Sequence, residues 1–187
     1  KVIKKKKIEN VIIEASSHGL HQERLHHIDF KSAVFTNFSQ DHLDYHKNMK
    51  AYLNAKLILF RKILRKKTKI ISDKDILPFK ILKKISKKRG FKLVDINNEF
   101  LKVKNQLPAF PDFKKKNLAM GILVAKICGL KDHLIYGKIK KINDVNGRLE
   151  LVKKFPNKIK VFLDYAHTQD ALLKTLECLK NENKKNI

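Results

Sequence analysis

Short apolar runs that alternate with longer amphipathic segments are the feature that most limits how this chain can fold. Four such runs stand at residues 11–15 (VIIEA), 32–37 (SAVFTN), 69–72 (KIIS) and 92–95 (KLVD). Continuous apolar runs of this length are typical of strands buried on both faces, as in a parallel sheet. Because strands that alternate with helices build α/β folds, the sequence predicts a mostly parallel sheet flanked by helices.

Helical spacing of apolar residues is clearest between residues 47 and 64, where they recur every three or four positions. Three further helices are predicted at 79–88, 116–128 and 131–142. Gly129 follows the second of these and is the residue type that most often ends a helix. Residues 97–112 are predicted as loop and edge strand, and a strand, a loop and a helix are expected in turn between residues 158 and 180.

The chain carries 43 lysine and arginine residues against 18 acidic ones, which gives a formal net charge of +25 at pH 7. Such a charge suggests a nucleic-acid surface, so a basic nucleic-acid-binding module is kept as an alternative function. Only five of the basic residues are arginines, however, and arginine is the better donor for phosphates and bases. The lysines are also spread along most of the chain. A solvated lysine coat is therefore favoured, and its field would also attract a small anionic substrate.

No apolar run of the sequence approaches the roughly 20 residues that a membrane-spanning helix needs. The sequence begins at Lys1, without an initiator methionine or a signal peptide. We therefore expect a soluble, cytoplasmic segment of a longer protein, one that has no membrane partner and acts as a monomer.

One short stretch concentrates groups that can carry chemistry, since Asp41, His42, Asp44 and His46 lie within six residues. Lys56 follows on the apolar side of the next predicted helix. A lysine in such a place usually extends its ammonium group to the edge of the apolar surface. If it is buried instead, it needs a charged partner or loses its proton. A neutral lysine amine can react with carbon dioxide to form a carbamate, an anion that binds metal ions.

A magnesium site is one interpretation of this stretch. Glu14 and His42 each follow a predicted strand, and polar residues at the carboxyl ends of neighbouring strands meet at one edge of a sheet. One carboxylate, one imidazole and the carbamate of Lys56 would be suitable ligands for Mg²⁺, completed by water and phosphate oxygens. The simpler alternative makes His42 a hydrogen-bond partner of a neighbouring aspartate, while the other polar residues brace or cap the following helix.

Four stretches of the sequence together resemble one enzyme family. They are EASSHGLHQERL at 14–25, FTNFSQDHLDYHKNMKAYLNAK at 35–56, NGRLE at 146–150 and DYAHTQDAL at 164–172. In this order they are similar to motifs of the Mur ligases, specifically the MurE type, the UDP-N-acetylmuramoyl-L-alanyl-D-glutamate–diamino acid ligases. The first two stretches are the most specific, and the resemblance covers most of the chain.

The resemblance implies how the chain is divided. Residues 1–146 would form most of a central ATP-binding domain of the P-loop type. Residues 147–187 would supply the first strand and helix of a Rossmann-like C-terminal domain, which binds the amino acid. The Gly-rich GK[ST] loop that holds phosphates in such domains is absent from the sequence and would precede Lys1. The fragment alone is therefore expected to be inactive.

The resemblance also implies roles for individual residues. The residues implied to bind Mg²⁺ are Glu14, His42 and Lys56, and Lys56 matches the lysine that the family carbamylates for catalysis. Those implied to contact the UDP-muramoyl-dipeptide are Ser16, Gln22 and Arg24. Those implied to contact ATP are Asn117, Arg148, Asp164 and His167. Two residues depart from the family pattern, namely Lys114, where FNxxN has its first asparagine, and Gln169, where proline is usual.

The function that the resemblance implies is an ATP-dependent amide ligase of peptidoglycan synthesis. Such an enzyme would add a diamino acid, meso-diaminopimelate or L-lysine, to UDP-MurNAc-L-Ala-D-Glu through an acyl-phosphate intermediate. Its cofactor would be Mg²⁺, and ATP would be the co-substrate. A folylpolyglutamate-synthetase-like ligase stays open as an alternative, because those enzymes also use a carbamylated lysine.

Overall fold

The computed structural model describes residues 8–108, 110–139, 141–142 and 145–184. The described chain forms two compact units. The first contains the chain up to Phe38 and from His42 to Ile135, and the second contains Ser39–Asp41 and the chain from Tyr136 onwards. The domain boundary between residues 146 and 147 that the sequence suggests stays a prediction.

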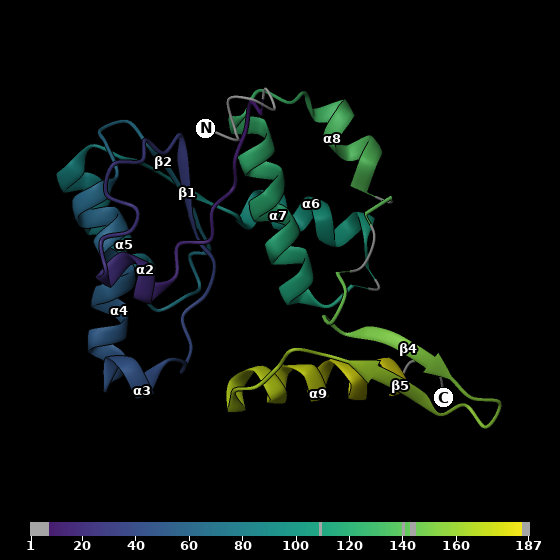
Figure 1. Cartoon of the computed structure of the whole chain (residues 1–187). Helices are drawn as coiled ribbons and strands as arrows, with labels where there is room; N and C mark the ends of the chain where they lie inside the picture. The colour runs from purple at the N-terminus through teal and green to yellow at the C-terminus, as the bar shows by residue number, and fades with distance from the viewer. Residues whose placement is uncertain (1–7, 109, 140, 143–144, 185–187) are drawn as a thin grey trace. The chain divides into compact units, whose positions relative to one another are not determined.

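A parallel three-stranded sheet lies within the first unit (Figure 1). Its strands follow the order β1 (Ser32–Phe35), β2 (Lys69–Ser72) and β3 (Lys92–Asp95). Both neighbouring pairs are parallel and in register, so the three strands end at the same edge of the sheet. The predicted α/β class is confirmed. Strands β2 and β3 coincide with the predicted runs, and β1 ends two residues before the predicted one.

The helices of the first unit follow the predicted alternation of strands and helices. They are α2 (Ser17–His21), α3 (Leu43–His46), α4 (Met49–Ile58) with its continuation as the π-helix η1 (Leu59–Ile63), α5 (Phe79–Arg89), α6 (Asn97–Gln106) and α7 (Asp112–Ile127). Helix α8 (Asp132–Ile139) spans the boundary between the units. Gly129 follows α7 with a φ of 97°, a left-handed conformation that glycine adopts without strain.

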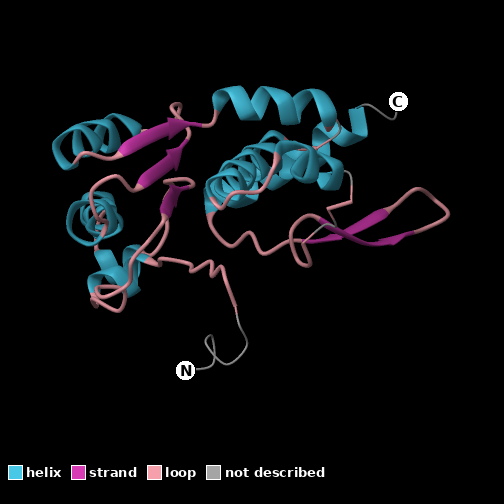
Figure 2. Cartoon of the chain, turned by 90° about the horizontal axis from the view of Figure 1, so that it is seen from above, coloured by secondary structure: helices cyan, strands magenta, loops and turns pink. Residues whose placement is uncertain are grey.

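Both faces of the sheet are covered, which explains why its strands are apolar without alternation. Ile70 belongs to a core that also contains Leu57 and Phe60 of α4 and η1 and Leu82 of α5. Its neighbour Ile71 points to the opposite face and is equally buried. Helix α7 packs against β1 and β2, and Figure 2 shows helices on both sides of the three strands.

The strand predicted at residues 11–15 is wrong. This stretch is coil outside the sheet, and the side chain of Ile12 is 91% exposed. A buried strand needs a neighbour that pairs with its backbone N–H and C=O groups. None of the described strands pairs with residues 11–15, so Glu14 does not stand at the end of a described strand.

Two helical regions also differ from the prediction. Helix α6 occupies residues predicted as loop and edge strand, because it packs against α7 and buries Val103. The helix predicted over residues 47–64 is broken at its start. Lys47 has a φ of 65°, and the Asn48 side chain begins α4 by accepting the Ala51 N–H at 2.9 Å.

The second unit contains an antiparallel hairpin of β4 (Glu150–Lys154) and β5 (Lys160–Leu163), followed by helix α9 (Gln169–Lys184). Strand β5 and helix α9 are the strand and helix expected between residues 158 and 180. Strand β4 was not predicted, although the motif NGRLE leads directly into it. Within the described part of the chain, no helix combines the length and apolar character needed to cross a membrane.

Candidate functional site

Histidine and tyrosine rings gather where α2, α3 and α4 meet. The centroid of the His18 ring lies 4.9 Å from that of His42 and 5.4 Å from that of His46. His46 is buried at the end of α3, and its Nε2 forms a 2.9 Å hydrogen bond with Ser17 Oγ. Tyr52 of α4 is buried as well, with its ring 5.4 Å from that of His46. The two most specific motifs of the sequence therefore meet in the folded chain.

Tyr52 connects two of the predicted metal ligands. The ring centroids of His42 and Tyr52 lie 5.9 Å apart, with the rings nearly perpendicular. The Nζ of Lys56 lies 4.9 Å from the Tyr52 ring centroid, within the range of a cation–π contact. The structure thus brings His42 and Lys56 to one buried ring. His42 also has a left-handed backbone, with φ 52° and ψ 30°, which is uncommon for a residue other than glycine.

Glu14, the third predicted ligand, is exposed in the coil before Ser16. The residues that the structure describes include no group of three or more His, Cys, Asp or Glu side chains arranged to hold a metal ion. The predicted set contains only two residues of these types, because its third ligand would be the carbamate of Lys56. The magnesium site therefore stays a prediction.

His46 connects α2 and α3 through its hydrogen bond to Ser17. Burial lowers the pKa of His46 below its usual 6.5, and repulsion from three neighbouring histidines lowers it further, while Asp44 opposes the shift. A neutral imidazole is sufficient for the hydrogen bond to Ser17. This hydrogen bond joins His46 to the preceding helix α2, whereas the simpler interpretation expected His46 to brace or cap the following helix, where the Tyr52 ring lies 5.4 Å from that of His46.

The three residues predicted to contact the substrate surround the short helix α2. Ser16 begins this helix, since its Oγ accepts the Gly19 N–H at 3.1 Å. Gln22 ends it, and the backbone N–H of Arg24 donates to the Gly19 carbonyl at 2.9 Å. The side chains of Gln22 and Arg24 are exposed, so one segment presents them to solvent. Their contacts with substrate remain predicted.

An open surface depression of about 710 Å³ lies beside α2, α3, α4 and η1. Its lining includes the cationic side chains Lys47, Arg61 and Lys62 and the imidazoles of His21 and His46. None of the described residues that line it carries a carboxylate. Such a lining suits an anionic ligand.

Three of the four residues predicted to contact ATP gather around Tyr165 in the second unit. The guanidinium carbon of Arg148 lies 5.0 Å from the Tyr165 ring centroid, and His167 Nδ1 lies 3.0 Å from the Tyr165 carbonyl oxygen. The Asp164 carboxylate accepts two backbone N–H groups, at 2.7 and 2.8 Å. The fourth residue, Asn117, is exposed on α7 of the first unit. Their contacts with ATP stay predictions.

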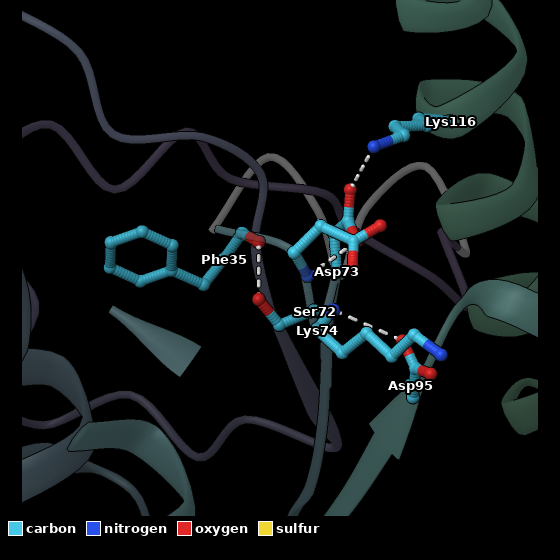
Figure 3. A network of polar contacts seen from close by, with 7 residues as sticks. Phe35, Ser72, Asp73, Lys74, Asp95 and Lys116 are labelled. Atoms are coloured by element: carbon cyan, nitrogen blue, oxygen red, sulfur yellow. Dashed lines mark hydrogen bonds and ion pairs between the residues drawn. The ribbon is translucent and has the colours of Figure 1, made fainter. Parts of the chain in front are cut away.

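The sequence analysis missed a polar network at the carboxyl ends of β2 and β3, shown in Figure 3. Asp73 directly follows β2 and is buried, and its Oδ2 lies 2.5 Å from the Nζ of Lys116. Asp95 ends β3 and accepts the backbone N–H of Lys74 at 3.1 Å. Both carboxylates stand at the end of a predicted strand, where ligands of α/β sheets gather. That position was the signal that could have revealed them.

Comparison with known families decides the ancestry of the chain. The sequence profile of the Mur ligase middle domain matches residues 1–124. The chain belongs to the Mur ligase family. The family predicted from the four motifs is therefore confirmed, and the parallel sheet of the first unit lies within the matched residues.

Several relatives of this Mur ligase chain are named UDP-N-acetylmuramoyl-L-alanyl-D-glutamate–2,6-diaminopimelate ligase. The protein of Wigglesworthia glossinidia brevipalpis is 36% identical over 98% of this chain and 42% of its own length. That of Rickettsia conorii is 34% identical over 93% of the chain and 40% of its own length. That of Aquifex aeolicus is 35% identical over 94% and 39%, respectively. The Mur ligase chain thus spans about two fifths of the length of these curated relatives.

Proposed function

We propose that the protein containing this chain is an ATP-dependent amide ligase of peptidoglycan synthesis. It would add a diamino acid to UDP-MurNAc-L-Ala-D-Glu in the cytoplasm, as a monomer. The observation that carries the proposal is the 36% identity, over 98% of the chain, to a protein named for the addition of 2,6-diaminopimelate. This similarity supports 2,6-diaminopimelate over L-lysine. It also favours the Mur ligase activity over the folylpolyglutamate-synthetase-like alternative and the nucleic-acid-binding alternative.

The proposed reaction has two steps. The D-glutamate carboxylate attacks the γ-phosphorus of ATP, an acyl phosphate forms and ADP leaves. The amine of the diamino acid then attacks the acyl carbon and loses a proton, so that an amide bond forms and phosphate leaves. Ser16, Gln22 and Arg24 would hold the substrate in line with the phosphate, because their segment presents hydrogen-bond donors and one fixed charge to solvent.

Glu14, His42 and a carbamylated Lys56 would hold Mg²⁺ in this proposal. Mg²⁺ bound there would neutralise the phosphates of ATP and the charge that develops during transfer. The donor set fits a cation only after carbamylation, because the ammonium group of Lys56 is itself a cation. Lys56 would lose one proton, its Nζ would attack the carbon of CO₂, and a second proton would leave. The position of His42 and Lys56 beside the same Tyr52 ring supports placing these two residues in one site.

Contacts with ATP are proposed for Asn117 in the first unit and, separately, for Arg148, Asp164 and His167 in the second. The side chains of Asn117, Arg148 and His167 are exposed and therefore accessible to a ligand. The Asp164 carboxylate is held in a fixed orientation by its two backbone hydrogen bonds. A fixed carboxylate at the end of β5 would suit the hydroxyl groups of a ribose.

A ligase assay on the complete gene product that contains this chain tests the activity. Phosphate release and product mass are measured with ATP, Mg²⁺ and UDP-MurNAc-L-Ala-D-Glu, in separate reactions with meso-diaminopimelate and L-lysine. A parallel reaction contains ATP, Mg²⁺, a reduced folate and L-glutamate. We expect product with meso-diaminopimelate and none without the dipeptide substrate. Product only from a reduced folate and L-glutamate would overturn the proposal in favour of the alternative ligase.

The Lys56 carbamate can be tested without turnover. The protein is incubated with ¹³C-labelled bicarbonate, and the carbamate carbon is observed by NMR. Lys56→Arg is expected to remove the signal, since a guanidinium group does not form the carbamate. Lys50→Arg is the matched control, because Lys50 is an exposed lysine of the same helix. Equal signals in both variants would exclude Lys56 as the modified residue.

A further inference from the structure

Helix α7 carries two lysines that pair with buried carboxylates, in a chain whose lysines are mostly exposed. Lys116 pairs with Asp73, whose side chain is 5% exposed. Lys126 pairs with Glu99 at 3.0 Å, and the Glu99 side chain is 7% exposed. The two lysine side chains are 34% and 23% exposed. The pairs are thus similar in burial but stand at different places along one helix.

The Asp73–Lys116 pair joins α7 to the edge of the sheet at which the parallel strands end (Figure 3). Asp73 is held in place by a second contact, since its Oδ1 accepts the Asp75 N–H at 2.9 Å. The preceding residue, Ser72, donates its hydroxyl to the Phe35 carbonyl at 3.0 Å. The carboxylate is therefore attached to a rigid strand end, and Lys116 reaches it from the helix.

Asn117 is the next residue of α7, and its side chain is exposed. Consecutive residues of an α-helix are separated by about 100° of rotation and 1.5 Å of rise. An ion pair that fixes Lys116 against the sheet edge therefore fixes the direction of the Asn117 side chain. The Glu99–Lys126 pair acts about 15 Å further along the helix, at 1.5 Å per residue, and holds the other end.

We propose that Asp73 and Lys116 are positioning residues, which orient Asn117 toward the nucleotide. The inference rests on the proposed function, in which Asn117 contacts ATP. Buried ion pairs generally add little net stability over apolar packing, because removing two charges from water offsets their attraction. Their geometric effect is greater, since a small displacement of a binding group can lower the rate of a reaction by about 10²-fold.

The test compares Asp73→Asn with the matched control Glu99→Gln in the complete gene product. Both changes remove one buried negative charge and preserve the shape of the side chain. Asp73→Asn is expected to raise the KM for ATP roughly tenfold, while kcat stays within about twofold and the KM for the dipeptide substrate is unchanged. Glu99→Gln is expected to lower the melting temperature by about as much as Asp73→Asn does, without changing the KM for ATP.

Two further variants keep the test decisive if Asp73→Asn folds poorly. Lys116→Met should reproduce the higher KM for ATP, and Lys116→Arg, which keeps the ion pair, should restore a KM near that of the original protein. Equal KM values for ATP in Lys116→Met and Glu99→Gln would overturn the positioning role.

A readout without nucleotide separates this inference from the proposed function. In NMR spectra of the complete gene product without nucleotide, Asp73→Asn should shift the side-chain amide signal of Asn117, whereas Glu99→Gln should not. If the unmodified protein is inactive but Asp73→Asn still causes this shift, the proposed ligase activity is wrong, whereas the orientation of Asn117 by the Asp73–Lys116 pair is supported. If the unmodified protein is active but Asp73→Asn changes neither the Asn117 signal nor the KM for ATP, only the positioning role of Asp73 and Lys116 is wrong.

Discussion

Replacing Tyr52 by leucine should loosen the candidate site and destabilise the first unit. The buried Tyr52 ring is stacked on Phe38 at a centroid distance of 5.3 Å. It also contacts His42, His46 and the ammonium group of Lys56. Leucine preserves an apolar side chain but removes the flat ring on which these contacts depend.

The expected cost follows from the contacts that are lost. The stacked pair with Phe38 contributes about 0.5–1.5 kcal/mol beyond the area it buries. In the chain without the carbamate, the cation–π contact of the Lys56 ammonium group adds about 0.5–1 kcal/mol. With the two histidine contacts and the volume left by the smaller side chain, we expect a total loss of about 2–4 kcal/mol. For a chain of this length, that loss corresponds to a melting temperature lower by roughly 4–16 °C.

Thermal and urea unfolding followed by circular dichroism would measure this change. Tyr45→Leu is the matched control, because Tyr45 also contacts three histidine rings but is exposed. It should cost less than about 1 kcal/mol, as is usual for surface contacts. Tyr52→Phe, which keeps the ring and removes only the hydroxyl group, should cost less than Tyr52→Leu. A Tyr52→Leu variant as stable as Tyr45→Leu would refute the argument that the buried ring organises the site.

Three other predictions concern stability. Burial lowers the pKa of His46 in the folded chain. The free energy of unfolding should therefore be greatest above pH 6.5 and decrease as the pH falls toward the pKa of His46 in the folded state. Urea titrations at several pH values should show this slope, and His46→Gln should flatten it. Burial acts to lower the pKa of Lys126, but hydrogen bonds to two carboxylates outweigh burial and raise that pKa above 10.5. The contribution of Lys126 to the free energy of unfolding is therefore greatest below pH 10.5 and is lost as the pH rises through the pKa of the folded state. Lys126→Met should abolish that alkaline loss in the same titrations. Leu82→Ala should lower the free energy of unfolding by about 2–5 kcal/mol, whereas Leu77→Ala, at an exposed position, should change it by less than about 0.5 kcal/mol, and a similar effect of both would contradict the core assignment.

The sheet could be predicted where local sequence and tertiary surroundings agree. The runs at 69–72 and 92–95 are short, apolar and bounded by polar residues, and they become β2 and β3 with the predicted limits. Residues 11–15 have a similar pattern but remain outside the sheet. Strand formation depends on a pairing partner distant in sequence, which an apolar run does not reveal. Helix α6 shows the same limitation, because its packing against α7 decides its structure.

The candidate site was predictable in its residue types and less so in its contacts. The motifs led to His42 and Lys56, but nothing in the sequence singled out Tyr52, because its central place depends on how α2, α3 and α4 pack. The Asp73–Lys116 pair was hidden for a different reason. Lys116 is one of many lysines, and only the packing of α7 against β2 distinguishes it from those on the surface.

The left-handed backbone of His42 limits which amino acids can replace it. An L-residue in this conformation is strained by roughly 1–2 kcal/mol, except for glycine and, in part, asparagine and aspartate. Asparagine at position 42 would thus remove the imidazole and keep the chain path, whereas valine or isoleucine would disturb both. In a library with every amino acid at position 42, the abundance of each variant would depend on how well its residue adopts the left-handed backbone. Ligase activity would depend on whether the imidazole is present. The two measurements would therefore separate the structural requirement at this position from the chemical one.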